Sequence, residues 1–182
     1  LTKLAIKLSS EQLSVVNNVL LEKIVVITGG PGTGKTTLIR ALCKVFKLQR
    51  LKVVLSAPTG RAARRLSEVT GEKAFTLHKL LGFDYENQTF ERNFANPLEL
   101  DVFIVDEASM VDTLLMYRLI EAMPASASLM LVGDTFQLPS VGPGNILSDI
   151  IESGRVKVFS LTTIFRQARQ SPIIMYAHSI RK

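Results

Sequence analysis

The chain has 182 residues, 47% of them hydrophobic and 21% charged, so it is long enough to bury one substantial core. Its longest apolar runs are of strand length and its N-terminus lacks the layout of a signal peptide, which predicts a soluble, cytoplasmic domain without a membrane partner. The single cysteine excludes an internal disulfide, and one cysteine with two histidines makes no metal-ligand set.

The positive charge is concentrated in one part of the sequence. The chain carries 22 Lys and Arg against 16 Asp and Glu, a net charge of +6. Between Arg40 and Lys79 ten basic residues stand against two acidic ones, so the remainder is slightly acidic. This pattern is typical either of the solvated face of two helices or of a surface that contacts a polyanion such as nucleic acid. The basic residues are Arg40, Lys44, Lys47, Arg50, Lys52, Arg61, Arg64, Arg65, Lys73 and Lys79.

Along the chain the hydrophobic period switches repeatedly between that of a helix and that of a strand. Ser9 and Gln12 are spaced as a capping box at the start of the first helix. We predict helices at 9–23, 35–49, 61–69 and 111–123, and strands at 24–28, 52–55, 102–105, 129–132 and 156–159. Such alternation predicts an α/β fold, a mostly parallel sheet with helices on both faces. Ligands of such sheets bind beyond the carboxyl ends of the strands.

The segment from Gly82 to Leu100 does not follow this alternation. Residues 83–85 and 89–91 alternate apolar and polar side chains around Glu86, Asn87 and Gln88. This pattern indicates either a small hairpin or an irregular surface loop. The turn lacks the Asn-Gly pair that would decide between the two.

A phosphate-binding loop follows the first predicted strand. Residues 29–36 read GGPGTGKT, which matches G-x-x-x-x-G-K-[ST] between a strand and a helix. Glycines let backbone N–H groups turn toward phosphate oxygens, and the helix N-terminus adds positive potential. Lys35 is expected to reach the β- and γ-phosphates of ATP, and the Thr36 hydroxyl to ligate Mg²⁺. The predicted nucleotide-binding residues here are Gly30, Pro31, Gly32, Thr33, Gly34, Lys35, Thr36 and Thr37.

Two adjacent carboxylates, Asp106 and Glu107, follow the apolar run at 102–105. A carboxylate at the end of a buried strand is costly unless a positive group meets it. Asp106 is therefore expected to hold Mg²⁺, and Glu107 to polarise the water that attacks the γ-phosphate. The alternative, a strand-ending turn or a helix cap, is weakened by the phosphate-binding loop upstream.

The stretch LVGDTFQLPSVGPGN, residues 131–145, runs from a buried strand into a loop rich in glycine and proline. These residues are ordinary in a surface turn. If the strand belongs to the same sheet, however, the loop lies over the nucleotide. Gln137 is uncharged and can hydrogen-bond the γ-phosphate or the attacking water, so we interpret the loop as a sensor of ATP against ADP.

In their order these motifs resemble those of RecD-like helicases, superfamily-one DNA helicases related to the alpha subunit of exodeoxyribonuclease V and to conjugative relaxase-helicases. The resemblance covers roughly residues 9–182 and includes Gln12, and GDTFQLPSVGPG together with FRQ is its most specific part. UvrD-type helicases are less similar. The matching motifs are GGPGTGKT, APTGRAARRL, TLHKLLG, IVDEASMVD, LVGDTFQLPSVGPGN and LTTIFRQARQSPI.

The resemblance implies further roles. Gln12 is similar to the glutamine that reads adenine, and Arg166 to the arginine that meets the γ-phosphate, although alone it would be an ordinary helix-end arginine. The Phe83 to Phe90 segment has the position of a strand-separating pin. Residues in the positions that touch single-stranded DNA are Pro58, Thr59, Gly60, Arg61, Thr76, His78 and Lys79, of which His78 could equally be a packing histidine.

The resemblance also implies an organisation. We expect residues 1–182 to be the first RecA-like motor domain of a 5′ to 3′ DNA helicase, with the second motor domain absent and required for turnover. Its expected partners are single-stranded DNA, that second domain and other recombination subunits. The alternatives are a stand-alone P-loop NTPase, such as a PhoH-like ATPase or nucleotide kinase, and a non-enzymatic loader that binds ATP and DNA without turnover.

Overall fold

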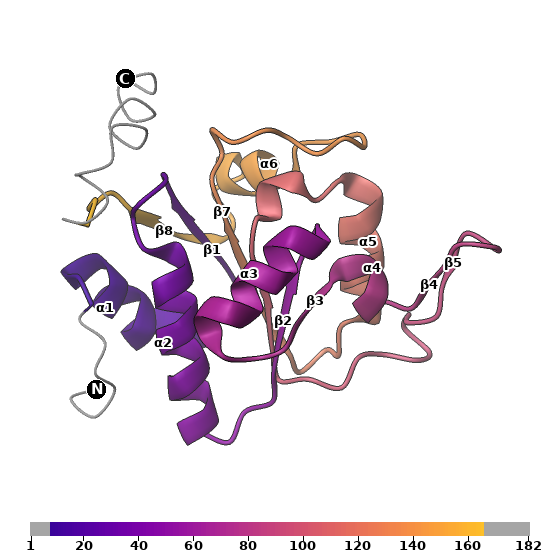
Figure 1. Cartoon of the computed structure of the whole chain (residues 1–182), viewed down its shortest axis with the longest axis horizontal. Helices are drawn as coiled ribbons and strands as arrows, with labels where there is room; N and C mark the ends of the chain where they lie inside the picture. The colour runs from indigo at the N-terminus through magenta and orange to yellow at the C-terminus, as the bar shows by residue number, and fades with distance from the viewer. Residues whose placement is uncertain (1–7, 166–182) are drawn as a thin grey trace.

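The computed structural model describes residues 8–165, and its centre is a six-stranded parallel sheet (Figure 1). The strands are β1 (Ile24–Gly29), β2 (Val53–Ala57), β3 (Ala74–Thr76), β6 (Val102–Val105), β7 (Ser128–Gly133) and β8 (Lys157–Leu161). They lie in the order β3-β2-β6-β7-β1-β8, and every neighbouring pair is parallel. All the strands therefore end along the same side of the sheet, which we call the carboxyl edge; the opposite side is the amino edge.

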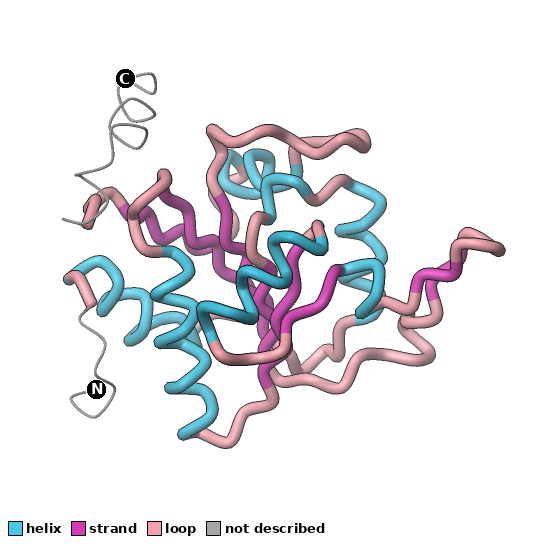
Figure 2. The backbone as a smooth tube through the Cα atoms, in the orientation of Figure 1, coloured by secondary structure: helices cyan, strands magenta, loops and turns pink. Residues whose placement is uncertain are grey.

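Helices cover both faces of this sheet (Figure 2). Consecutive strand side chains point to opposite faces, so Val25 and Ile27 pack against the first three helices and Val26 packs with the others. One layer contains α1 (Ser10–Asn18), α2 (Lys35–Leu48) and α3 (Gly60–Thr70), and the other contains α4 (Leu77–Leu80), α5 (Thr113–Ala122) and α6 (Ile146–Glu152). The predicted parallel sheet with helices on both faces is confirmed.

The elements that the sequence did not predict are short. β3 has three residues and α4 has four, too few to show a hydrophobic period. The helix α6 has seven residues and follows the loop rich in glycine and proline. The first helix is shorter than predicted, because a 3-10 turn, η2 (Val19–Leu21), follows Asn18. A second 3-10 turn, η3 (Ala108–Met110), follows β6.

The segment from Gly82 contains a hairpin, so that interpretation is confirmed over the irregular loop. Its strands β4 (Phe83–Asp84) and β5 (Thr89–Phe90) pair antiparallel and project away from the sheet (Figure 1). The Asp84 carboxylate accepts hydrogen bonds from the Glu86 N–H at 2.8 Å and from the Asn87 side chain at 2.6 Å. A carboxylate therefore organises the turn that lacks an Asn-Gly pair.

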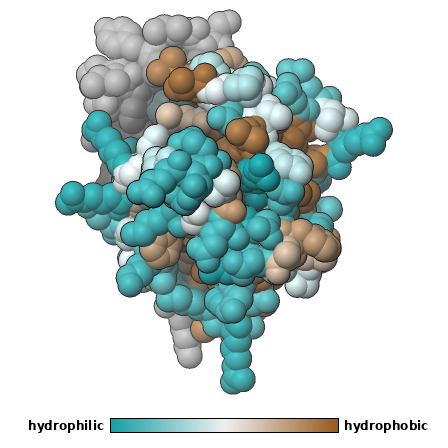
Figure 3. All heavy atoms as spheres, turned by 90° about the vertical axis from the view of Figure 1, so that its right-hand side faces the viewer, coloured by the Kyte–Doolittle hydropathy of each residue, from teal (hydrophilic) through white to brown (hydrophobic). Residues whose placement is uncertain are grey.

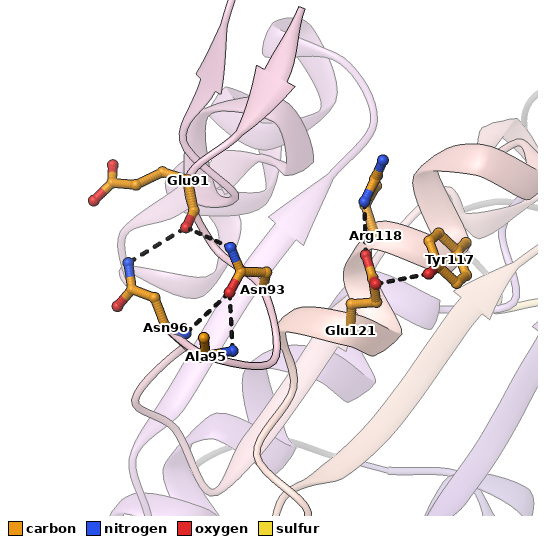
Figure 4. Close-up of polar contacts among 7 residues, drawn as sticks. All are labelled: Glu91, Asn93, Ala95, Asn96, Tyr117, Arg118 and Glu121. Atoms are coloured by element: carbon orange, nitrogen blue, oxygen red, sulfur yellow. Dashed lines mark hydrogen bonds and ion pairs between the residues drawn. The ribbon is translucent and has the colours of Figure 1, made fainter.

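A second turn follows the hairpin and is held by asparagines (Figure 4). The Asn93 side chain accepts from the N–H groups of Ala95 at 2.9 Å and Asn96 at 3.1 Å. The Glu91 carbonyl accepts from the side-chain amides of both asparagines at 3.3 Å. The surface on this side of the molecule is mostly hydrophilic with smaller hydrophobic patches (Figure 3).

In residues 8–165 no helix is long and apolar enough to cross a membrane.

Candidate nucleotide site

The carboxyl edge of the sheet brings together the predicted functional groups. Adjacent strands are about 4.8 Å apart, so groups that are distant in sequence meet when each ends its strand. In sheet order they are Thr76 ending β3, Pro58 and Thr59 after β2, Asp106 and Glu107 after β6, residues 134–137 after β7, and residues 29–36 at the end of β1. The edge thus has a β2–β3 half and, beside it, a nucleotide half at β6, β7 and β1.

The phosphate-binding loop has a tight backbone conformation that depends on its glycines. Gly34 has a φ of 79°, in the left-handed region that glycine tolerates best. A Cβ on Gly29 would lie 2.7 Å from the Thr33 hydroxyl and 2.8 Å from the Leu161 carbonyl, so the loop has no room for one. The Lys35 ammonium donates to the Gly29 carbonyl at 2.6 Å and is held inside its own loop.

Gln12 is completely buried beside this loop, and its side-chain amide bonds both the loop and the start of α1. Its amide nitrogen donates to the carbonyls of Gly34 at 3.2 Å and Thr33 at 3.5 Å. Its amide oxygen accepts from the Ser9 N–H at 3.0 Å, which completes the predicted capping box. Both ends of the amide are therefore bound by protein, and the loop and α1 are joined through it. The adenine-reading role of Gln12 stays a prediction.

The segment after β8 is hydrogen-bonded to α1 and to the phosphate-binding loop. The Glu11 carboxylate accepts from the Thr162 N–H at 3.0 Å and the Thr162 hydroxyl at 2.6 Å, and from the Thr163 N–H at 3.1 Å. The Phe165 N–H donates to the Gly32 carbonyl at 3.2 Å. Neither residue was among the predicted site residues: no motif signals a role for Glu11, whereas Phe165 belongs to the FRQ motif, which was the available signal. Arg166 lies outside the described residues.

Asp106 and Glu107 end β6 in an unfavourable environment for charge. Asp106 is 8% exposed. Its pKa is raised from 3.8 to about 6, mainly because the carboxyl is buried and secondly because the charge of Glu107 is close. Glu107 has a φ of 54°, a left-handed backbone that is uncommon for a non-glycine residue. Its Oε2 atom is buried and has no hydrogen-bond partner among the described residues. A cation beside Asp106 and a water beside Glu107 would relieve both costs.

A cleft of about 400 Å³ joins these groups. It is lined by much of the phosphate-binding loop, by both carboxylates, by Gln137 and by one side of α3. The α3 residues, Ala62, Arg65, Leu66 and Val69, were not predicted as part of the nucleotide site. A larger hollow of about 610 Å³ lies between α1 and β8, but none of the predicted site residues is among those that line it. The smaller cleft is therefore the candidate site.

Gln137 lies in a loop that is anchored at both ends. At its start Asp134 is buried and accepts from the Phe136 N–H at 3.1 Å. At its end the Pro143 carbonyl accepts from the Thr113 N–H at 3.0 Å, so the loop is joined to the first turn of α5. Gln137 itself is exposed and lines the cleft. The loop thus runs from the nucleotide half of the edge to another helix.

The predicted DNA-contacting residues gather at the β2–β3 half. Thr59 caps α3 by accepting from the Ala62 N–H at 3.2 Å, and Thr76 caps α4 by accepting from the Lys79 N–H at 3.2 Å. Ala57 and Thr76 are register partners in β2 and β3, so the two capped ends are adjacent. Pro58, Gly60 and Arg61 lie at the same strand end, and Arg61 and Lys79 are exposed.

His78 packs against the hairpin. Its ring centroid lies 5.3 Å from that of Phe83, edge to face, and 6.0 Å from that of Phe90. The histidine therefore joins α4 to the hairpin through aromatic contacts. Its contact with DNA stays a prediction, as does the role of the hairpin as a pin.

The basic stretch does not form a single surface. Lys47 pairs with Glu72 at 2.6 Å, and Lys52, which precedes β2 at the amino edge, pairs with Glu99 at 2.9 Å. These lysines lie toward the amino edge of the sheet, whereas Arg61 and Lys79 lie at its carboxyl edge. A polyanion that follows the carboxyl edge would therefore meet only part of the stretch, and the polyanion interpretation stays a prediction for that part.

One cleft holds the phosphate-binding loop, the buried Asp106, the partly buried Glu107 and the loop residue Gln137. This combination defines a P-loop nucleotide-binding domain. A family model described as an AAA domain matches residues 12–143. The chain therefore belongs to this family, and the resemblance to RecD-like superfamily-one helicase motor domains is confirmed by the similar proteins below.

The chain is 46% identical over 173 residues to the ATP-dependent RecD2 DNA helicase of Deinococcus radiodurans. The aligned region covers 95% of the chain and 24% of that protein. It is 39% identical over 166 residues to the RecBCD enzyme subunit RecD of Mycolicibacterium smegmatis, covering 78% of the chain and 30% of the relative. The crystal structure of the Pif1 helicase from Candida albicans aligns with a TM-score of 0.74 at 30% identity, over 97% of the chain and 44% of that structure.

We predict that Gln12→Ala destabilises the chain without nucleotide by about 1–3 kcal/mol, because buried carbonyls of the phosphate-binding loop lose their donor. Thermal unfolding without nucleotide measures this, and Ser14→Ala, an exposed change on the same helix, is the control. An unchanged melting temperature for Gln12→Ala would show that the amide does not support the loop.

We predict that Asp106→Asn stabilises the ligand-free chain by about 1–3 kcal/mol at neutral pH. The folded-state pKa is raised from 3.8 to about 6, so the protonated carboxyl favours the fold, and this contribution is lost as the pH rises through about 6. The advantage of Asn should therefore shrink as the pH falls toward about 4. Thermal unfolding across this pH range, with a chelator present, tests it; a gap that does not change with pH would contradict it.

Proposed function

We propose that the chain is the ATP-driven motor domain of a 5′ to 3′ DNA helicase that couples ATP hydrolysis to movement along single-stranded DNA. The observation that carries this proposal is the carboxyl edge, where the cleft lined by the phosphate-binding loop, both carboxylates and Gln137 lies beside the capped ends of α3 and α4. The names of the similar proteins support the helicase activity and the use of ATP. The chain spans 24% and 30% of the length of the two relatives, so the activity of a whole protein is part of this proposal.

The residues of the cleft have different roles in ATP binding and hydrolysis. Lys35 binds the β- and γ-phosphates, and the backbone N–H groups of the loop hold the other phosphate oxygens. Thr36 and Asp106 would hold Mg²⁺, which when bound neutralises phosphate charge. Glu107 orients the attacking water and accepts its proton, for which its unpartnered Oε2 is available. Gln137 contacts the γ-phosphate or that water.

The proposal includes a second motor domain that supplies an arginine to the γ-phosphate. Such arginines contribute about 10³–10⁵ in rate in P-loop enzymes, so the chain alone should bind ATP but turn it over slowly and unwind no duplex. Arg166 is proposed to act from the segment after β8. Recombination subunits are proposed as further partners because a relative is named as a subunit of RecBCD. A kinase is disfavoured because we find no substrate lid or acceptor site in the sequence.

We predict that Lys35→Ala and Glu107→Gln separate binding from hydrolysis. Lys35→Ala should weaken ATP·Mg²⁺ binding about tenfold or more, because a charged phosphate contact is lost. In the full-length parent, Glu107→Gln should bind ATP as the parent does but hydrolyse it about 10²–10⁴ times more slowly, because only the general base is removed. Fluorescence titration and single-turnover hydrolysis measure the two effects. Hydrolysis at the parental rate in Glu107→Gln would make the assignment of the base wrong.

We predict that removing the charges of Arg61 and Lys79 weakens single-stranded DNA binding for every sequence tested. Each lost phosphate contact should lower the slope of log affinity against log salt by roughly 0.7. Lys52→Ala is the matched control, because Lys52 belongs to the same basic stretch but lies at the amino edge. Equal losses for Lys52→Ala and the double variant would mean that the carboxyl edge is not the binding surface.

A further inference from the structure

One face of α3 belongs to the nucleotide cleft. Ala62, Arg65, Leu66 and Val69 line it, and their spacing of three, four and seven residues places them along one side of a helix. Three of the four are apolar. Arg65 is therefore the charged group that this helix presents to the site.

Arg64, the preceding residue, has a different environment. Its guanidinium pairs with Glu68 at 3.0 Å one turn further along α3, and it is not among the residues that line the cleft. The Arg65 guanidinium, by contrast, makes no hydrogen bond or ion pair with a side chain or backbone group of residues 8–165. Its guanidinium is thus available to an anion, and its planar donors suit phosphate oxygens.

The position of Arg65 in the cleft indicates which phosphate it meets. The helix α3 follows β2, and β2 pairs with β6, the strand that leads into Asp106 and Glu107. Arg65 lines the same cleft as both carboxylates. Arg65 therefore acts on the end of the cleft that holds both carboxylates, where water must attack the γ-phosphate. The backbone of the phosphate-binding loop faces the other phosphates.

We propose that Arg65 is a second phosphate-binding cation, whose guanidinium contacts the γ-phosphate of bound ATP and distinguishes ATP from ADP. This inference rests on the proposed function, since it requires that the cleft binds ATP. It assigns to α3 a catalytic residue that the motifs of the sequence did not indicate. The same helix is capped by Thr59 at the β2–β3 half, and one of its faces lines the cleft.

The test compares Arg65→Ala with Arg64→Ala in the 182-residue chain. Affinities for a non-hydrolysable ATP analogue and for ADP, both with Mg²⁺, are measured by fluorescence titration. Arg65→Ala should bind the analogue about tenfold or more weakly, while its affinity for ADP changes less than about twofold. Arg64→Ala should match the parent for both nucleotides. Arg65→Lys should be intermediate for the analogue, because it keeps the charge but loses the planar donors.

The outcomes distinguish the two proposals. Unchanged affinity of Arg65→Ala for the analogue, or an equal loss for ADP, would overturn the role of Arg65 and leave the proposed function intact. A loss of single-stranded DNA binding without nucleotide, with analogue affinity unchanged, would assign Arg65 to the DNA surface instead. A parent chain that binds no analogue would overturn the proposed function itself. Both arginines are exposed, so neither variant should lose the fold, and thermal unfolding checks this.

Discussion

The common direction of the six strands is the constraint on which the rest of the structure depends. Because β1, β6 and β7 all end at the same edge, a phosphate-binding loop and two carboxylates that are about 70 residues apart in the chain become neighbours. Antiparallel pairing of any one of these strands would move its group to the opposite edge. The nearly continuous burial of β6 and β7 is typical of parallel strands that are covered by helices on both faces.

Strand order also determines what lies beside the nucleotide. β6 separates β7 from β2, and β2 and β3 end in the capped turns of α3 and α4. The nucleotide half and the β2–β3 half are therefore adjacent parts of one rigid edge rather than separate sites. α3 starts in one half and lines the cleft of the other, so a displacement of this helix changes both. In the proposed motor domain, α3 is the element through which binding in one half would alter the other half.

The cleft contains features that reduce stability. A left-handed Glu107, a buried Asp106 and an unpartnered carboxylate oxygen all act against the ligand-free fold. In the same region Gln12 of α1 and the Phe165 N–H donate hydrogen bonds to the phosphate-binding loop, and Glu11 of α1 accepts hydrogen bonds from the segment after β8. The supporting contacts surround the strained groups, which is the arrangement that keeps a reactive geometry in place before the substrate arrives.

The sequence predicted the sheet and the motif residues because both depend on local patterns. The apolar run before Asp106 and the spacing of GGPGTGKT identify strand ends without tertiary information. Arg65 and Glu11 could not be found in this way. Arg64 and Arg65 are adjacent and chemically identical, and only the packing of α3 against the sheet decides which one faces the cleft and which one pairs with Glu68. Glu11 contacts a threonine 151 residues away, and no periodicity records such a contact. A residue type is therefore predictable from a motif, whereas the direction of its side chain depends on the assembled fold.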